Sequence, residues 1–293
     1  MDPVKRSLIT LHITVVLLGG TALFSQIIPL SAADITLGRS LFACLALFIF
    51  LRLSKENFRL DAPRDYAIAT GLGALMALHW VTYFAAMQYA GVSVGMIALF
   101  TFPVITVLIE PLFEKSRLAW QDMISAIIVF VGIALIVPES SLNNDVTLGV
   151  ITGIFSAVLY AIRNLLHRQH FSHYSGAKAM AWQIMVVCVC LIPTLSGSLT
   201  GASQTSWWLL AILGTLFTAL PHALIAATLV HLKAKTFSLI ACMQPFYGVL
   251  LAIVLLGEKP GWKALVGGAL VISASVYETV NTHKQQKADS KCG

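Results

Sequence analysis

Charged residues are scarce in this chain. Only 11% of its 293 residues are Asp, Glu, Lys or Arg, while 58% are hydrophobic. An ordinary soluble domain is about 25% charged and about 45–50% apolar. With a mean hydropathy of +0.84, the chain has more apolar surface than a soluble fold of this size buries. The composition excludes a soluble protein and predicts an integral membrane protein.

Sequence signatures of catalysis and metal binding are also missing. Four of the five cysteines lie inside apolar runs, and none has the spacing of a metal site or a disulfide framework. There is no Gly-x-Ser-x-Gly, no His-Glu-x-x-His and no nucleotide-binding glycine loop. We therefore expect no cofactor, no metal and no ATP-driven pumping by this chain alone. A membrane-embedded enzyme is disfavoured, and a channel would need a filter-like segment or a ring of charges.

The long apolar runs that are present have the length of membrane spans. About 20 apolar residues in a helix cross the hydrocarbon core. By that measure the spans are 8–28, 33–53, 66–88, 92–113, 119–137, 147–167, 177–196, 208–230, 236–256 and 261–280. The predicted fold class is an all-α integral membrane protein of ten transmembrane helices joined by short polar loops.

The basic residues are distributed unevenly between alternate loops. If the N-terminus is cytoplasmic, 16 of the 19 Lys and Arg residues fall in cytoplasmic segments, and only Lys259 and Lys263 fall outside. Such a bias orients membrane proteins. We therefore attribute the net charge of +6 to topology rather than to nucleic-acid binding. The expected location is a bacterial inner membrane, with both termini in the cytoplasm.

An internal repeat divides the chain into two halves. Placing Pro103 on Pro245, an offset of 245 − 103 = 142, needs no gap over the next seventeen residues and brings Trp120 onto Trp262. The predicted units are residues 1–140 and 141–281, followed by a disordered cytoplasmic tail at 282–293. Five spans is an odd number, so the second half is expected to be inverted relative to the first, as in many transporters.

Short motifs then indicate a family. They are Thr101-Phe102-Pro103-Val104 and Glu110-Pro111-Leu112-Phe113 in span four, Gln244-Pro245 in span nine, Leu256-Gly257-Glu258-Lys259 after it, and Gly267-Gly268 in span ten. Together they resemble the drug/metabolite transporter superfamily, in particular its EamA-type ten-helix members. One departure is that Ser116 stands in the first half where Glu258 stands in the second. Any role of that acid is therefore single-sided.

The resemblance implies a central cavity lined mainly by spans three, four, eight and nine, with five and ten peripheral. It also implies a secondary transporter with alternating access that moves amino acids or related small metabolites, in the direction of export. Uptake or exchange of another metabolite, such as S-adenosylmethionine, a nucleoside or a sugar, is the alternative. The expected partners are a small-molecule substrate and the lipid bilayer, and a homodimer is left open beside a monomer.

Two charged residues lie inside predicted spans. Arg39 in span two costs about 2.5–3.5 kcal/mol at such a depth unless it is paired or hydrated. We therefore favour a role for it in binding an anionic group, with extension to the outer surface as the alternative. Glu110 in span four is a candidate for proton coupling, because burial raises the pKa of a carboxyl group. An ion pair with a base such as Arg163 is the alternative for Glu110.

Uncharged polar and aromatic residues complete the predicted substrate site. His79 and Tyr83 are one helical turn apart on span three, and Trp80 corresponds to His222 under the repeat offset. The other candidates for substrate binding are Tyr160, Trp182, Gln183, Gln244 and Tyr247. Each lone histidine is at least as well explained by a structural hydrogen bond. Pro103 and Pro245 are predicted to kink spans four and nine, either for gating or as static kinks.

Overall fold

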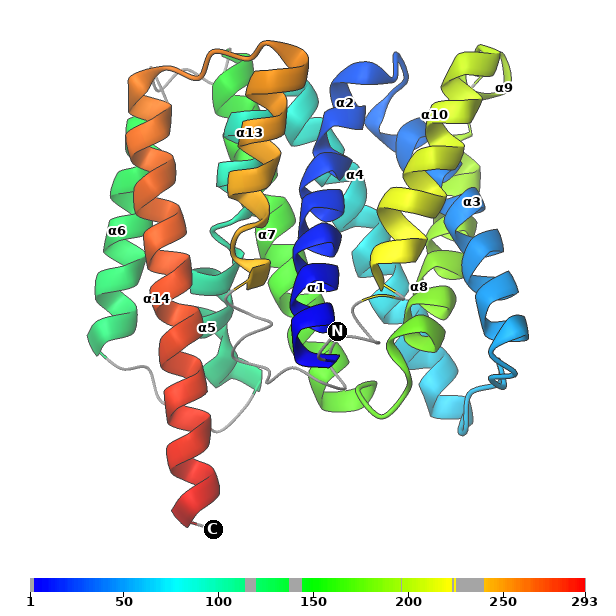
Figure 1. The fold of residues 1–293 in the computed structure, drawn as a ribbon, viewed down its shortest axis with the longest axis horizontal. Helices are drawn as coiled ribbons and strands as arrows, with labels where there is room; N and C mark the ends of the chain where they lie inside the picture. The colour runs from blue at the N-terminus through cyan, green and yellow to red at the C-terminus, as the bar shows by residue number, and fades with distance from the viewer. Residues whose placement is uncertain are drawn as a thin grey trace.

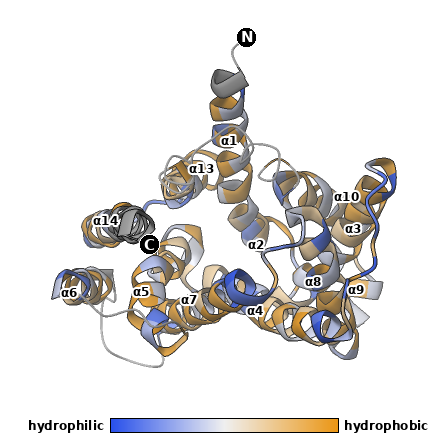
Figure 2. Cartoon of the chain, turned by 90° about the horizontal axis from the view of Figure 1, so that it is seen from below, coloured by the Kyte–Doolittle hydropathy of each residue, from blue (hydrophilic) through white to orange (hydrophobic). Residues whose placement is uncertain are grey.

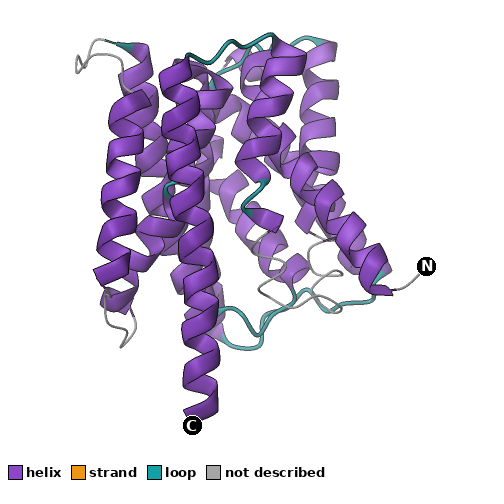
Figure 3. Cartoon of the chain, turned by 60° about the vertical axis from the view of Figure 1, so that its left-hand side comes forward, coloured by secondary structure: helices purple, strands orange, loops and turns teal. Residues whose placement is uncertain are grey.

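The structure, a computed structural model, describes residues 3–113, 120–136, 144–195, 197–222, 224 and 240–292. Within these ranges the chain forms helices and loops and no strand (Figure 3). The long helices lie side by side as a bundle (Figure 1). The prediction of an all-α fold is therefore confirmed for the described part of the chain.

The helices follow the predicted spans closely. Their bounds are α1 Pro3–Gly20, η1 Thr21–Leu23, α2 Phe24–Ile27, α3 Ala32–Leu53, α4 Pro63–Leu99, α5 Phe102–Phe113, α6 Trp120–Ile136, α7 Asp145–His170, α8 Gly176–Leu191, η2 Ile192–Thr194, α9 Gly197–Thr200, α10 Gln204–Gly214, η3 Thr215–Ala219, α13 Gln244–Leu256 and α14 Trp262–Cys292. Each predicted span overlaps at least one of them. Parts of the predicted spans 208–230 and 236–256 lie outside the described residues.

Lengths and surfaces are those of a multi-pass membrane protein. Five described helical segments are long and apolar enough to cross a membrane, and four shorter apolar helices accompany them. Large apolar side chains face outward, as at Phe130 of α6, which is 74% exposed. Apolar residues cover most of the helices, while polar ones gather near their ends (Figure 2). Such surfaces are stable in lipid rather than in water.

Local sequence sets several of the helix starts. Ser31, Ser175 and Ser203 each accept a hydrogen bond from the backbone N–H three residues later, and Asn144 accepts one from Val146. These are the residue types that cap the unpaired amides of a helix N-terminus. They place the starts of α3, α7, α8 and α10.

The fourth predicted span is broken rather than continuous. Gly91, with φ of 80°, interrupts α4, and a short helical stretch then runs to Leu99. After a turn at Phe100 and Thr101, the chain continues as α5. Pro103 is the second residue of α5. The predicted kink within a continuous helix is therefore wrong for Pro103, because its missing N–H falls in the first turn, where no helical partner exists.

Pro245 occupies the matching position. It is the second residue of α13, directly after Gln244. There too the proline begins a helix and does not bend one. Gly257, with φ of 68°, ends the same helix in the left-handed conformation that glycine adopts readily.

Helix pairs surround the centre of the molecule. Seen from below, α4 and α7 form one side and α1 and α13 the opposite side (Figure 2). The pair α6 and α14 stands at one edge, and α3, α8 and α10 stand at the other. Small residues allow close contact, since a Cβ on Gly132 would meet the Gly267 carbonyl oxygen at 2.8 Å.

The predicted disordered tail requires a correction. Helix α14 continues through it to Cys292 and extends beyond the other helices in Figure 3. Residues 282–292 include three Lys and two Gln, which favour helix, and no Gly or Pro; they extend a helix that is already nucleated. The polar composition of the tail was therefore not a sufficient reason to predict disorder.

Candidate functional site

A cavity of about 450 Å³ lies inside the helix bundle. Its lining residues come from nearly every part of the fold: Leu18, Thr21, Arg39, Met76, His79, Trp80, Tyr83, Leu99, Phe100, Phe102, Pro103, Tyr160, Arg163, Asn164, Met180, Phe217, Thr218, His222, Ala241, Cys242 and Gln244. No described residue of α6 or α14 is among them. The predicted peripheral position of spans five and ten thus agrees with this lining, but the wall draws on more spans than the four expected. The volume of the cavity lies in the range of small-molecule binding sites.

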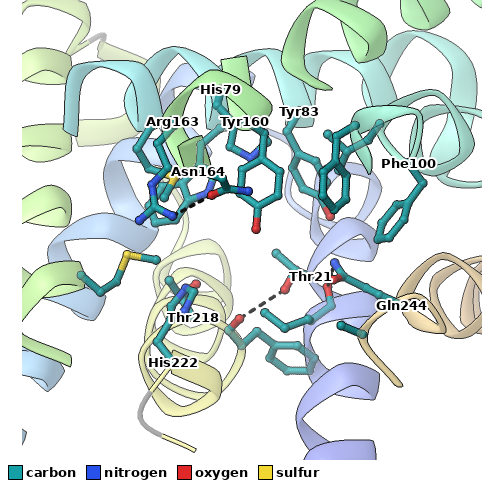
Figure 4. Close-up of a pocket in the computed structure, with 18 of the residues that line it drawn as sticks. Thr21, His79, Tyr83, Phe100, Tyr160, Arg163, Asn164, Thr218, His222 and Gln244 are labelled. Carbon is teal, nitrogen blue, oxygen red and sulfur yellow. Dashed lines mark hydrogen bonds between the residues drawn. The ribbon is translucent and has the colours of Figure 1, made fainter. Parts of the chain in front are cut away.

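Two facing walls are visible in Figure 4. His79 and Tyr83 of α4 stand with Tyr160 of α7 on one side, and Thr21 stands with Gln244 on the other. The two walls therefore bring together residues that are far apart in the sequence. Aromatic and polar side chains share the space between them.

His79 is held in place by residues of α7. Its Nδ1 lies 2.8 Å from Ser156 Oγ, while that hydroxyl donates to the His79 carbonyl oxygen at 2.9 Å. The imidazole stacks on the Tyr160 ring with centroids 4.7 Å apart. His79 is thus both a structural hydrogen-bonding residue and part of the cavity wall.

Arg39 points inward rather than toward the outer surface. It is only 2% exposed, and its guanidinium carbon lies 3.8 Å from the centre of the Trp80 ring and 4.9 Å from that of Phe84. Its Nε and Nη2 are buried and have no hydrogen-bond partner among the described residues. The alternative of extension to the membrane surface is therefore wrong.

Arg163 is a second guanidinium in the wall. Its Nε and Nη2 donate to Gln183 Oε1 at 2.8 and 2.6 Å, and its Nη1 donates to Asn164 Oδ1 at 3.0 Å. Gln183 is fully buried and its own amide donates to the Ala179 carbonyl oxygen. Gln183 therefore orients Arg163 and is not itself among the lining residues.

The broken helices bring backbone turns to the cavity. Phe100, Phe102 and Pro103 line it where α4 gives way to α5, and Cys242 and Gln244 line it where α13 begins. Gln244 Nε2 donates to the Leu18 carbonyl oxygen at 3.4 Å. Non-helical backbone at membrane depth is tolerated where it lines a cavity.

Most predicted site residues meet in this cavity. They are Arg39, His79, Trp80, Tyr83, Pro103, Tyr160, His222 and Gln244. Five other predicted residues lie outside the lining: Gln183, which holds Arg163, together with Glu110, Trp182, Pro245 and Tyr247. Trp182 donates to the Phe58 carbonyl oxygen and stacks on that ring, Pro245 is buried in the first turn of α13, and the Tyr247 hydroxyl contacts His12.

The helical spacing argument failed for Tyr247 because α1 packs closely against α13. A Cβ on Gly19 would come within 2.9 Å of the Gln244 carbonyl oxygen. The next turn of α13 therefore faces α1 instead of the cavity. Gln244 therefore lines the cavity and Tyr247 does not, although the two residues are only three apart in the helix.

Glu110 is outside the cavity as well. Its Oε1 lies 2.5 Å from Arg168 Nη2, so its ion-pair partner is Arg168 rather than Arg163. The Arg168 side chain is 41% exposed and that of Glu110 is 17% exposed. This places the pair at the rim of the helix bundle.

The main residues that we did not predict as site members are Arg163, Asn164, Thr21 and Thr218. Arg163 is one of the 16 Lys and Arg residues that the predicted topology assigns to cytoplasmic segments. A signal was present, because Arg163 lies four residues inside the predicted end of span six, and a charge at depth calls for a partner. For the two threonines the sequence offers no such signal.

Comparison with known proteins agrees with this architecture. A model of the EamA-like transporter family matches residues 5–137 and 147–277. A solved crystal structure superposes with a TM-score of 0.63 at 14% identity, covering 94% of this chain and 98% of that one. Identity this low indicates a shared fold only.

Three relatives illustrate the range of the family. The chain is 24% identical to the uncharacterised transporter YxxF of Bacillus subtilis, covering 97% of this chain and 92% of the relative. It is 23% identical to a biotin transporter of Escherichia coli, covering 85% of each. It is 24% identical to the threonine/homoserine exporter RhtA of Escherichia coli, covering 92% of this chain and 89% of the relative. Since the family model spans nearly the whole chain, this protein belongs to the EamA-like transporter family.

Proposed function

We propose that this protein is a secondary transporter that carries a small metabolite across a bacterial inner membrane by alternating access. The observation that supports this most directly is the cavity of about 450 Å³, lined from both halves of the chain and from broken helices. A polar and aromatic hollow inside apolar helices is the usual form of a carrier site. The family is one of transporters rather than enzymes.

Ten spans in two inverted halves are part of the proposal. One pair of helix starts supports it, because α13 begins at Gln244 and α5 begins at Phe102, an interval of 244 − 102 = 142 residues. The family model also matches two ranges of nearly equal length. Helices α6 and α14, which correspond under this offset, run in opposite directions (Figure 1).

Hydrogen bonds join the two halves of the chain at opposite ends of the bundle. We propose that each set closes the cavity toward one side of the membrane. At one end Glu258 accepts from Val92 N–H and Ser93 N–H at 2.6 and 3.0 Å. At the other end the Tyr174 hydroxyl donates to Asp65 at 2.6 Å. In the proposed cycle, opening toward one side of the membrane separates one set while the other stays closed.

The substrate class and the direction of transport are proposed here in addition to the family assignment, which specifies neither. The substrate class is amino acids or related small metabolites, and the direction is export. Among the relatives, the name of one refers to threonine and homoserine and that of another to biotin, so relatives alone do not select a substrate. Uptake or exchange of S-adenosylmethionine, a nucleoside or a sugar remains the alternative.

Counterflow into proteoliposomes tests this function. Vesicles loaded with an unlabelled metabolite are expected to accumulate the labelled form transiently, for at least one of threonine, homoserine, phenylalanine, 3-phenylpropanoate and biotin. The blocking variant is Thr218→Trp, since Thr218 lines the cavity and is 2% exposed. The matched control is Thr215→Trp on the exposed face of the same turn.

We expect counterflow to be lost in Thr218→Trp and retained in Thr215→Trp. Folded protein without exchange of any compound in the panel would contradict the proposal. So would equal exchange by the two tryptophan variants, because transport would then bypass the cavity.

A further inference from the structure

Two positive charges in the cavity wall lack an acidic partner among the described residues. Arg39 is buried, lines the cavity, and leaves Nε and Nη2 without any hydrogen bond to the described chain. The hydrogen bonds described above for Arg163 go only to the neutral amides of Gln183 and Asn164. A buried guanidinium without an anion is costly. The wall is thus preorganised for a negative charge that the described residues do not supply.

The sequence shows that no acid comes from the neighbouring segment. Between Asp145 and Glu258 there is no Asp or Glu at all. That stretch includes positions 223 and 225–239, which precede the lining residues Ala241 and Cys242. Positions 223 and 225–239 therefore bring no carboxylate to the cavity.

Three acids within or near the described helices are engaged elsewhere. Asp34 accepts from Ser198 Oγ at 2.7 Å, Glu110 pairs with Arg168, and Glu258 caps the helix that follows Gly91. None of these acids is among the lining residues of the cavity. A ligand is therefore the source of negative charge that fits best.

The apolar residues of the wall indicate what the uncharged part of that ligand should be. Besides Trp80 beneath Arg39, the cavity is bordered by Phe100, Phe102 and Phe217 and by the thioether of Met180. Such a surface favours an apolar or aromatic group. An ammonium group would meet two guanidinium charges and no carboxylate among the described lining residues. A doubly charged phosphate would cost more to desolvate beside these apolar side chains than a monocarboxylate.

We propose that the cavity binds a small organic monocarboxylate with an apolar or aromatic body and no ammonium group, paired with Arg39 and Arg163. This inference rests on the proposed transport function; of the substrate class proposed there, it selects small metabolites without an ammonium group and excludes the amino acids themselves. It distinguishes simple carboxylates from zwitterionic amino acids by charge. It also assigns Gln183 to positioning one of the two guanidinium groups.

A matched series of ligands tests the charge rule on the purified full-length protein. The compounds are 3-phenylpropanoate, 3-phenylpropanamide, phenylalanine, 3-phenylpropylamine and phenyl phosphate, with hexanoate as a second carboxylate body. Binding is measured by calorimetry. We expect one of the two carboxylates to bind about tenfold or more tightly than the amide, phenylalanine, the amine and the phosphate, as for loss of a charged hydrogen bond.

Variants then test the two arginines. Arg39→Met and Arg163→Met are each expected to weaken carboxylate binding about tenfold or more and to leave amide binding unchanged. Gln183→Glu places a carboxylate against Arg163 and is expected to weaken carboxylate binding in the same way. The matched control is Arg52→Met, because Arg52 is exposed and lies over the Phe48 ring at 5.9 Å. It should bind like the unmodified chain.

The outcomes separate this inference from the transport proposal. Equal or tighter binding of the amide, amine, amino acid or phosphate, or no binding of either carboxylate, overturns the inference even if an arginine variant fails to fold. If counterflow occurs with phenylalanine and not with carboxylates, transport stands and the inference falls. If a carboxylate binds as expected but nothing exchanges, the site stands and the transport proposal falls.

Discussion

At the scale of single residues, neutral amides hold the cavity cation Arg163 in position. Gln183 accepts two of its hydrogen bonds and is itself fully buried. Removing a buried acceptor leaves donors unsatisfied, which costs about 1–3 kcal/mol. The packing of α7 against α8 at this point should therefore be stabilised by the hydrogen bonds that Gln183 Oε1 accepts from Arg163.

We accordingly expect Gln183→Met, which keeps the length of the side chain, to lower the free energy of unfolding by about 1–3 kcal/mol. The measurement is the thermal transition in detergent without ligand. Gln204→Met, at an exposed position in the first turn of α10, is the control and should leave the transition in place. An unchanged Gln183→Met transition would mean that water replaces the amide.

At the scale of elements, a single acid caps a broken helix. Glu258 accepts hydrogen bonds from Val92 N–H, Ser93 N–H and Ser93 Oγ, at the start of the short stretch that follows Gly91. A carboxylate there satisfies unpaired amides and the positive end of the helix dipole. The same contact ties the loop after α13 to α4.

Glu258→Ala is therefore expected to lower stability by about 1–2 kcal/mol, as for loss of an N-cap residue. Glu258→Gln, which keeps one acceptor oxygen, should fall between the Ala variant and the unmodified chain. Thermal unfolding of the three proteins in one detergent provides the ranking. Equal transitions for Ala and Gln would show that acceptance of hydrogen bonds at this position is not what stabilises the turn.

At the scale of the whole molecule, the direction of insertion follows from charge. Arg59 lies between α3 and α4, and Lys259 lies between α13 and α14; both are exposed. With the proposed orientation these loops are on opposite sides of the membrane.

In intact cells we expect Lys259→Cys to react with a membrane-impermeant maleimide and Arg59→Cys to react only after permeabilisation. The unmodified chain, with its own five cysteines, supplies the background. Mass spectrometry of the labelled peptides identifies the site. The reverse pattern would invert the proposed topology, and labelling of both in intact cells would contradict an odd number of crossings between them.

Composition and apolar run length were enough to predict the helices, and most of the residues predicted for the site line the cavity. Arg39 and His79 stood out because polar groups are rare inside spans, and that rarity has a direct physical cost. The starts of α5 at Phe102 and α13 at Gln244 are likewise separated by 142 residues, the offset of the proposed repeat. These are properties of short segments, so the sequence carries them without knowledge of the packing.

Partner choice and side-chain direction were decided only by tertiary structure. Whether Glu110 pairs with Arg163 or Arg168, and whether Trp182 and Tyr247 face the cavity, depends on which helices touch and how closely glycines let them approach. The breaks at Gly91 and before Pro103 likewise turn one predicted span into two pieces. Periodicity describes the faces of a helix, but only the neighbouring helices determine which face is covered and which lines a cavity.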